Sequence, residues 1–438
     1  MTTIPDVADA LHRVLNDVAE EEAYSTGFVR RSSKLSGPAF AQGLVFGWLG
    51  NAQASLSSLA KMTAAVGVKI SNQGLDKRFT QRAAIFMREV LQAVVAEVIA
   101  ADQVAIPLLQ RFNGVVLQDS STVVLPNALR DVWRGNGSRT GNGEAAVKMQ
   151  VRLDLSNGKL QGPLLEDGRT QDKSSSIQTE PLPTGALRIA DLGYFSLGVL
   201  QDLEAQKDYY LSRLQIQTVV FDEEGNRLDL LHLLRETGAV EVDIPVQLGV
   251  QYRLKARLLA VRVPQEVADA RRRRMRRAAR VRGQTVSKKA KALADWTILV
   301  TNAPKEKLTV DDALAIARAR WQIELMFKLW KQHGKIDEWR SKNPWRILCE
   351  FYAKLVAVVI QHWLSVVGVW RFPDRSLVKA AQTVRDFAIM LASGIAGVID
   401  LEVVISQIKI CLEAGCRMNR RKKKPNTYQL MLDTAAAA

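Results

Sequence analysis

The stretch DDALAIARARWQIELMFKLWKQHGK, residues 311–335, predicts a helix with two contrasting faces. At about 100° per residue, one face carries a single acid, Glu324, with positive charges within roughly 40° of it. That face consists of Ala317, Arg320, Glu324, Lys328 and Lys331. The other face is the apolar stripe of a helix packed on a core, namely Ile316, Ile323, Met326, Phe327, Leu329 and Trp330. The sequence therefore predicts that one edge of this helix faces something anionic.

A solvated surface is the simpler interpretation of the same face, because Glu324 has a cation four residues before it and another four residues after it. Such pairs stabilise a helix by only a few tenths of a kcal/mol each. Two further isolated acids favour a shared function. Asp119 in GVVLQDSSTVVLP is predicted at the end of a short apolar strand, 115–117. Asp191 in LRIADLGYF is predicted at the end of a second apolar strand.

The elements around these acids follow an α/β order. A β-hairpin turned at residues 156–158 and a polar link, 169–180, separate the two Asp strands; a helix, 196–207, and another strand follow. With the Glu324 helix, this order predicts a ribonuclease-H-like catalytic core with an inserted β-rich subdomain, flanked by helical N- and C-terminal regions. The predicted segments are helical 1–108, core 109–215, insert 216–308, core 309–373 and helical 374–438.

The N-terminal region contains a predicted helix-turn-helix. A helix at 57–65 breaks at Gly67 and restarts at residue 71 or 72. The side chains that this arrangement offers to a DNA groove are Asn72, Gln73, Lys77 and Arg78. Helix pairs broken by glycine also occur in purely structural bundles, so the DNA-reading role stays one of two interpretations.

The insert holds a very basic segment, RRRRMRRAARVRGQTVSKKAK, residues 271–291, which has no acidic residue. Such a block repels itself and is typical of a mobile arm that binds phosphates without reading sequence. Arg272, Arg273 and Arg276 are the candidate contacts. A Trp-rich helical hairpin, 337–370, and further helices, 376–418, are predicted after the Glu324 helix. A second basic run follows at 420–424.

Composition narrows the class of partner. Lys+Arg 61 against Asp+Glu 45 gives a formal charge of +16, which suits nucleic acid first and an anionic membrane surface second. Three scattered cysteines exclude a disulfide framework and indicate a reducing cytosol. No signal peptide is visible, and the longest apolar run, 355–370, is too short to span a bilayer. The glycine-rich stretch 135–143 misses the spacing of a nucleotide cradle and is predicted to be a flexible loop.

Three carboxylates on separate elements suit a hard divalent cation, Mg²⁺ or Mn²⁺. Two such ions activate an attacking oxygen and stabilise the leaving oxygen of a phosphodiester. Asp119, Asp191 and Glu324 are therefore the candidate metal ligands, and Arg320, Lys328 and Lys331 the cations that hold the cleaved strand. The four histidines are scattered, which disfavours a zinc site or a Ser-His-Asp triad.

At this point the chain resembles a known family. Arg320, Glu324 and Lys331 reproduce most of the signature tyrosine-x2-arginine-x3-glutamate-x6-lysine of the insertion-sequence-four transposases, which are cut-and-paste D-D-E enzymes. LQDSSTV and IADLGYF match the family's first and second aspartates, and the likeness extends from the helical N-terminal region to about residue 370. Ala317 occupies the position of the signature tyrosine, which leaves open how the transferred DNA end is handled.

The resemblance also implies roles for two tryptophans. Trp321 matches an aromatic residue that lies close to DNA in relatives. Trp296, in ADWTILVTN, is placed like the tryptophan that holds a flipped base while a DNA end closes into a hairpin. A buried core position is the alternative for Trp296.

The resemblance implies a transposase that binds the terminal inverted repeats of its element and cuts both strands at each end, through a hairpin. It then joins the 3′ ends to target DNA. We expect double-stranded DNA as the partner, a homodimer in the DNA complex, no membrane, and a cytoplasmic location on the bacterial nucleoid. Two alternatives stay open: a non-catalytic DNA-binding repressor derived from a transposase, and a metal-dependent nuclease.

Overall fold

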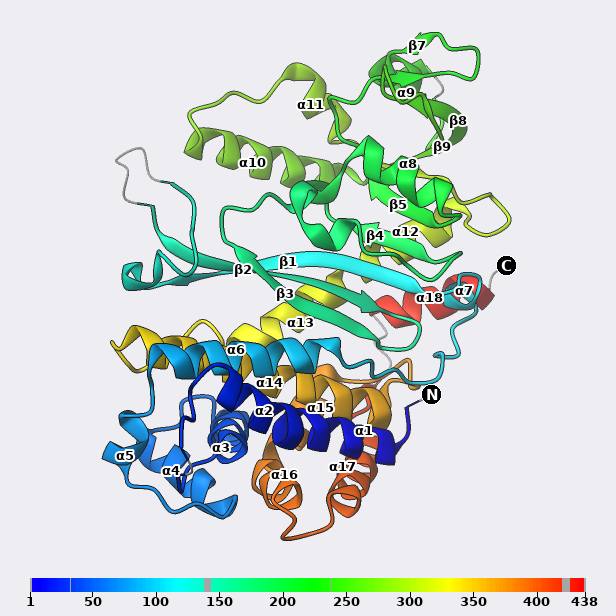
Figure 1. Cartoon of the computed structure of the whole chain (residues 1–438). Helices are drawn as coiled ribbons and strands as arrows, with labels where there is room; N and C mark the ends of the chain where they lie inside the picture. Colours follow the sequence, from blue (N-terminus) through cyan, green and yellow to red (C-terminus); the bar gives the residue numbers. More distant parts are fainter. Residues whose placement is uncertain (1, 32, 138–142, 237, 420–425, 437–438) are drawn as a thin grey trace. The chain divides into compact units, whose positions relative to one another are not determined.

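The chain forms two compact units in the computed structural model, which describes residues 2–31, 33–137, 143–236, 238–419 and 426–436 (Figure 1). The first unit comprises Met1–Ile106, Asp119–Thr170 and Trp321–Gln429. The second comprises Pro107–Gln118, Gln171–Arg320 and Leu430–Ala438. Part of the predicted glycine-rich loop at 135–143 and all of the basic run at 420–424 lie outside the described residues. Each unit joins stretches that are distant in the sequence, so the two units do not correspond to the five predicted segments. The five-segment division stays a prediction.

The first unit begins with helices close to the predicted ones. They are α1 Ile4–His12, a π-helix Arg13–Val18, α2 Ala19–Ser25, α3 Gly37–Gly50, α4 Leu56–Ala65, α5 Asn72–Asp76 and α6 Gln81–Ala96. The Ser36 hydroxyl accepts from the Ala39 backbone N–H and so caps α3. A Cβ on Gly43 would lie 2.4 Å from the Thr63 hydroxyl, so glycine permits α3 to pack closely on α4. The break after α4 falls at Gly67, as predicted, where φ is +92°.

The same unit contains the predicted hairpin, β2 Ala145–Asp154 and β3 Leu160–Asp167, which pair antiparallel. The strand order here is β3-β2-β1, and β1 spans Val115–Leu125. The prediction ended that strand at residue 117 and was wrong. Its burial changes from continuous over 115–118 to irregular beyond, so only the first part has the apolar pattern that a buried strand shows.

The rest of the first unit is helical: α13 Trp321–Gln332, α14 Pro344–Val369, α15 Leu377–Asp386, α16 Ala388–Ile395 and α17 Leu401–Gly415. The predicted helical hairpin at 337–370 is instead one long helix, α14, that contacts α3, α6, α15 and α17 (Figure 1). Among the described residues α14 is the one helix long and apolar enough to cross a membrane, but 89% of its most apolar window is buried in the protein. A core helix passes the same test.

The second unit is built on strands, in the order β1-β4-β5-β10-β9-β8-β6-β7. They are the first part of β1, β4 Leu187–Ala190, β5 Tyr209–Arg213, β6 Val220–Phe221, β7 Arg227–Leu228, β8 Glu241–Leu248, β9 Leu254–Arg262 and β10 Trp296–Thr301. Its helices are α7 Pro107–Gln110, α8 Leu197–Ala205, α9 Leu230–Glu236, α10 Gln265–Val281, α11 Lys288–Leu293 and α12 Val310–Ala319. Short 3₁₀ turns lie at Asn127–Leu129 in the first unit and at Asp172–Ser174, Ser176–Gln178 and Leu192–Tyr194 in the second. The last helix of the chain is α18 Thr427–Ala436.

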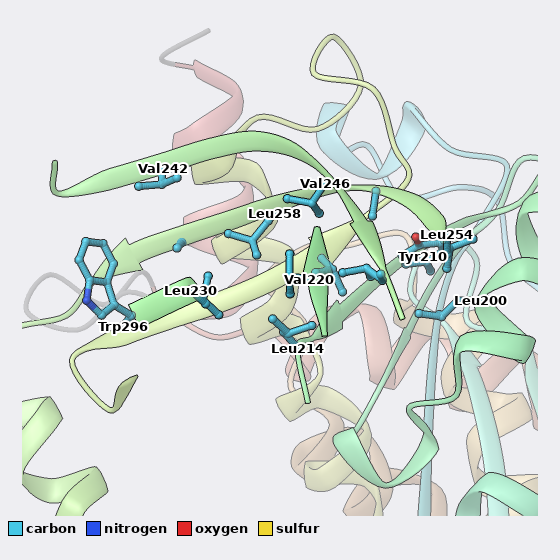
Figure 2. Packing of buried hydrophobic residues seen from close by; sticks show 14 of the residues in the cluster. Leu200, Tyr210, Leu214, Val220, Leu230, Val242, Val246, Leu254, Leu258 and Trp296 are labelled. Carbon is cyan, nitrogen blue, oxygen red and sulfur yellow. The ribbon is translucent and has the colours of Figure 1, made fainter. Parts of the chain in front are cut away.

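β1 pairs parallel with β4 and β4 pairs parallel with β5, whereas β10 pairs antiparallel with both β5 and β9. Leucine, valine and alanine side chains of β8 and β9 pack with the start of α9 and with Trp296 in one cluster (Figure 2). The insert therefore extends the sheet of the second unit and shares its core.

Two further predictions need correction. The helix predicted over 311–335 is two helices, α12 and α13, separated at Arg320. Neither glycine nor proline marks this break, which explains why the sequence pattern missed it. The basic segment 271–291 is largely helical, as part of α10 and α11, and is not an arm without structure.

Candidate active site

Asp119 and Asp191 follow paired residues of two parallel strands. In the second unit, β1 and β4 align Val115 with Leu187 and continue in register to Gln118 with Ala190. Asp119 is the next residue after Gln118, and Asp191 is the next after Ala190. β4 ends at Ala190, whereas β1 continues past Asp119 to Leu125. The register therefore aligns the residues that precede the two aspartates, and a shared metal site stays a prediction.

The carboxylates differ in their surroundings. In the first unit, Asp119 is half-buried within β1, and its Oδ1 accepts a hydrogen bond from the Ser120 backbone N–H at 2.8 Å. In the second unit, Asp191 is half exposed and opens the 3₁₀ turn Leu192–Tyr194, whose last N–H donates to its carbonyl. Both side chains have oxygen atoms at or near the surface, which a cation-binding carboxylate requires.

Around the aligned residues of β1 and β4 in the second unit lies a buried polar network that the sequence patterns did not identify. The Arg188 guanidinium is 3% exposed; its Nε donates to Gln118 Oε1 at 3.0 Å, and its terminal nitrogen donates to Gln178 Oε1. Arg188 therefore ties the residue before Asp119 to the polar link that precedes β4. The sequence did contain a sign of this network, because a single arginine interrupts the otherwise apolar LRIA strand and a buried arginine needs partners.

Arg320, at the C-terminal end of α12, lies next to Asp191. Its Nε is 3.9 Å from Asp191 Oδ1 within the second unit. The start of α12 is fixed by a capping box between Thr309 and Asp312, and Arg111 donates to Asp312 at 2.6 Å. Glu324 is four residues beyond Arg320, on the first turn of α13. Arg320 therefore lies beside one of the candidate acids, and its predicted role in binding phosphate stays a prediction.

In the first unit, α13 is attached to β1. The Lys331 Nζ donates to the Thr122 carbonyl at 2.9 Å, and Thr122 follows Asp119 by three residues. Glu324, Lys328 and Lys331 recur every four and three residues and so share one face of α13. Glu324 is half-buried, whereas Lys328 and Trp321 are exposed, Trp321 at 56%. The predicted apolar stripe of α13 is buried, as expected.

No group of three or more His, Cys, Asp or Glu side chains is close enough to hold a metal ion within the described parts of the chain. The donor set itself fits a hard cation, because Asp119, Asp191 and Glu324 offer only carboxylate oxygens. Each lies at least partly at the surface, with no sulfur or imidazole ligand among the predicted set.

Trp296 is 8% exposed and lies at one end of the apolar cluster of the second unit, at the start of β10 (Figure 2). The same cluster includes Val242 and Leu258. The core alternative therefore describes this tryptophan in the structure, and a role on an extruded base stays a prediction.

The predicted DNA-reading residues of the first unit lie at the surface. Asn72, Gln73 and Lys77 are exposed and Arg78 is half-buried. The helix that carries the first two, α5, is only five residues long, and its Asp76 pairs with Arg346 of α14 at 3.3 Å.

A family model described as "Transposase DDE domain" matches residues 110–360. The chain belongs to this family. The matched span of the transposase contains Asp119, Asp191 and Glu324, together with the signature residues around Glu324. Membership makes the protein a transposase enzyme, and the DDE domain implies divalent-metal dependence in general.

Curated relatives extend the likeness beyond that domain. The transposase for insertion sequence element IS231F of Bacillus thuringiensis subsp. israelensis is 25% identical over 98% of this chain and 94% of its own length. The transposase for IS231E of Bacillus thuringiensis subsp. finitimus is 28% identical over 81% of this chain and 78% of its own. The transposase for IS1151 of Clostridium perfringens is 22% identical over 79% and 76%.

Proposed function

We propose that the protein is the transposase of an insertion sequence, which cuts both DNA strands at each end of its element and joins the 3′ ends to target DNA. The observation that carries the proposal is the family match over 110–360, which includes all three candidate acids in the expected order. The names of the relatives support the link to insertion sequences, and the likeness to the IS231F transposase covers nearly the whole of both chains.

We infer a ribonuclease-H-like core for the catalytic region. The strand orders β3-β2-β1 and β1-β4-β5, with β1, β4 and β5 parallel and β2 and β3 antiparallel, support it. In such a core, Asp119, Asp191 and Glu324 would be the residues that hold two divalent cations, Mg²⁺ or Mn²⁺. The bound metal would lower the pKa of an attacking hydroxyl and neutralise charge on the leaving oxygen.

The neighbouring cations complete the site. Arg320 already contacts Asp191 and, in the proposed site, also binds the phosphate that is cut. Lys328 is exposed on the face of Glu324 and is available to a phosphate of the same strand. Trp321 presents an exposed ring for the DNA backbone or a base at the start of α13.

The reaction sequence consists of phosphoryl transfers in which one P–O bond forms as another breaks. Water first attacks the phosphorus at the element end, and a free 3′-hydroxyl leaves. That hydroxyl attacks the opposite strand to form a hairpin, whose opening by water restores the 3′-hydroxyl for attack on target DNA. In the hairpin step, Trp296 would stack on an extruded base only after its ring leaves the apolar cluster.

End recognition is assigned to Asn72, Gln73, Lys77 and Arg78 of the first unit. Two ends must be held for joining, so we propose a homodimer in the DNA complex and a place of action on the bacterial nucleoid.

The test is a single substitution at the proposed metal site. Glu324→Gln should lower magnesium-dependent nicking of terminal-repeat DNA by at least about a thousandfold, because an amide oxygen without charge does not replace a ligating carboxylate. Binding to the same DNA should stay within about twofold. Asp311→Asn, which removes an exposed carboxylate of α12, is the matched control and should cleave normally.

Retained cleavage by Glu324→Gln would remove Glu324 from the site. Incubation of wild-type protein with pre-cut 3′-hydroxyl ends and plasmid target separates the candidate activities. Joined product requires a transposase, hydrolysis alone indicates a nuclease, and binding without either product indicates a repressor.

A further inference from the structure

Helix α10 of the second unit has one side turned toward the protein and one side exposed, and arginines occur on both. Its partly or fully buried side includes Ala268, Arg271, Met275 and Ala279, which recur every three or four residues. That spacing is the inward stripe of a surface helix. The basic segment is therefore not one uniform block of charge, and its arginines divide by direction.

The inward arginines are held by the protein. Arg271 donates to the Trp296 carbonyl at 2.8 Å and to the Thr297 hydroxyl at 2.8 Å, so it attaches α10 to the start of β10. Arg272 pairs with Asp269 at 2.8 Å and with Asp295 at 2.5 Å. Its Nε also donates to the Lys291 carbonyl, at 3.1 Å. Arg272, one of the candidate DNA contacts, therefore has a structural role here.

The outward arginines are different. Arg273, Arg274, Arg276, Arg277 and Arg280 are all exposed. None of them forms an ion pair among the described residues, and α10 has no acid after Asp269. Beyond Asp269 the helix has no Asn, Asp, Glu or Gln, so its arginines are the groups there that can contact DNA. We call these five residues the outer arginine row.

We propose that the outer arginine row binds the phosphate backbone of duplex DNA of any sequence, outside the terminal repeats. Seven residues of helix span about 10 Å at 1.5 Å each. One strand of duplex has a phosphate about every 3.4 Å along the axis, so the row matches about three phosphates. The contacts of Arg271 and Arg272 hold the helix itself in place, so the backbone of the row needs no ordering when DNA binds.

This inference rests on the proposed function, since it assigns the row to the same DNA substrate. Two sources have the required chemistry: the DNA that flanks the element, and the target. Both are duplexes that lie outside the terminal repeats, and five cations along one side of a helix can contact phosphates in either. We therefore expect it to strengthen capture of such DNA without changing the preference for the repeats.

The experiment replaces the outer arginine row by glutamine, which keeps helix propensity while removing charge. Binding of wild type and variant to a duplex that lacks the repeats is measured by fluorescence anisotropy between 50 and 300 mM salt. The slope of log Kobs against log salt should become less steep by about 2.7, because each phosphate contact contributes about 0.9. A two-site variant, Arg276→Gln with Arg280→Gln, should lessen the slope by about 1.

The matched control removes the same charge from five other exposed cations of the second unit, Arg227, Arg235, Lys255, Arg262 and Lys305. It should change the slope by less than half as much. An unchanged slope in both row variants, or an equal change in the control, would overturn the proposal. Loss of binding to anionic phosphatidylserine vesicles with DNA binding unchanged would overturn it as well, in favour of a membrane surface.

Two further arms identify the source of the DNA. If the row holds flank, the advantage of cleavage substrates with 20 flanking base pairs over those with none should disappear in the variant. If it holds target, joining of pre-cut ends to plasmid should fall at least tenfold while cleavage is unchanged. A chain that neither cleaves nor joins would contradict the proposed function, whereas the salt slope would still decide the role of the row.

Discussion

His362 shows how a single buried residue can set the acid sensitivity of the first unit. Its Nε2 lies 2.8 Å from the Gly158 carbonyl, which can only accept, so Nε2 carries the proton. Burial lowers the pKa of His362 from 6.5 to about 4, and the nearby Arg375 guanidinium also lowers it. The imidazole ring is therefore neutral in the folded protein at neutral pH.

The sign of the pH effect follows from this shift. Between pH 6.5 and about 4 the unfolded chain binds a proton at His362 that the folded chain does not, so stability falls as the pH falls through this window. The loss amounts to about 3 kcal/mol by pH 4. His362→Gln should make urea-derived unfolding free energies less dependent on pH over that window. A variant as acid-sensitive as wild type would contradict the prediction.

Individual residues also show where sequence patterns fail. Asp191 was placed correctly because it follows an apolar strand, a local signal. Arg188 and Arg271 were not singled out, since their partners lie at distances along the chain that no periodic pattern records: 70 residues to Gln118 and 25 to Trp296. Arg272 was assigned to DNA because charge alone does not reveal which arginines are already paired.

Among the elements, α13 determines how Glu324 is presented. Its last turn is attached to β1 by Lys331. The residues just after it are packed on α14, where a Cβ on Gly334 would lie 2.9 Å from Val358. Lys354 of α14, which is 2% exposed, holds the segment that follows α13. It pairs with Glu350 and donates to the carbonyls of Lys335 and Glu338. Glu324 thus sits on a helix with limited freedom to move.

Lys331 has two candidate roles, attachment of α13 to β1 and binding of phosphate, and substitution of this residue separates them. Lys331→Met should lower the free energy of unfolding by about 1 kcal/mol, because it removes a charged donor from the Thr122 carbonyl. Lys328→Met, on the same face but exposed, should leave stability within about 0.5 kcal/mol. Chemical denaturation measures both. Full stability of Lys331→Met with weakened DNA binding would support the phosphate role alone.

Element type was easier to predict than element limits. The hairpin β2–β3, the apolar stripe of α13 and the helix–strand order around Asp191 all appear where local periodicity placed them. The break at Arg320 was missed because neither glycine nor proline marks it. The extension of β1 was missed because its continuous apolar pattern stops before the strand does. Local patterns were enough to single out the three candidate acids in the sequence. They did not predict the contacts near these acids, such as Arg188 with Gln118 or Lys331 with Thr122.

At the scale of the whole molecule, the chain passes between the two units after residues 106, 118, 170, 320 and 429. The first unit needs α14, whose side chains are nearly all buried, to cover α3 and α6. A fragment that ends at residue 320 should therefore expose the faces of α3 and α6 that α14 covers in the full chain.

That fragment should bind a hydrophobic dye such as ANS more strongly than the full chain and show weaker near-ultraviolet circular dichroism. Addition of a separately produced 321–438 fragment should reverse both signals, at least in part. A cooperatively unfolding 1–320 fragment with no excess dye binding would contradict the dependence of the first unit on α14.

The interleaved path of the chain also constrains inheritance. A single genetic crossover between two related elements exchanges everything on one side of a point, yet neither unit is contiguous in the gene. Every such recombinant with its junction between codons 107 and 429 therefore combines both parents within at least one unit, so side chains that must fit together come from different ancestors. Whole-gene replacement, or gradual substitution within each unit, would avoid this mismatch and keep each core packed.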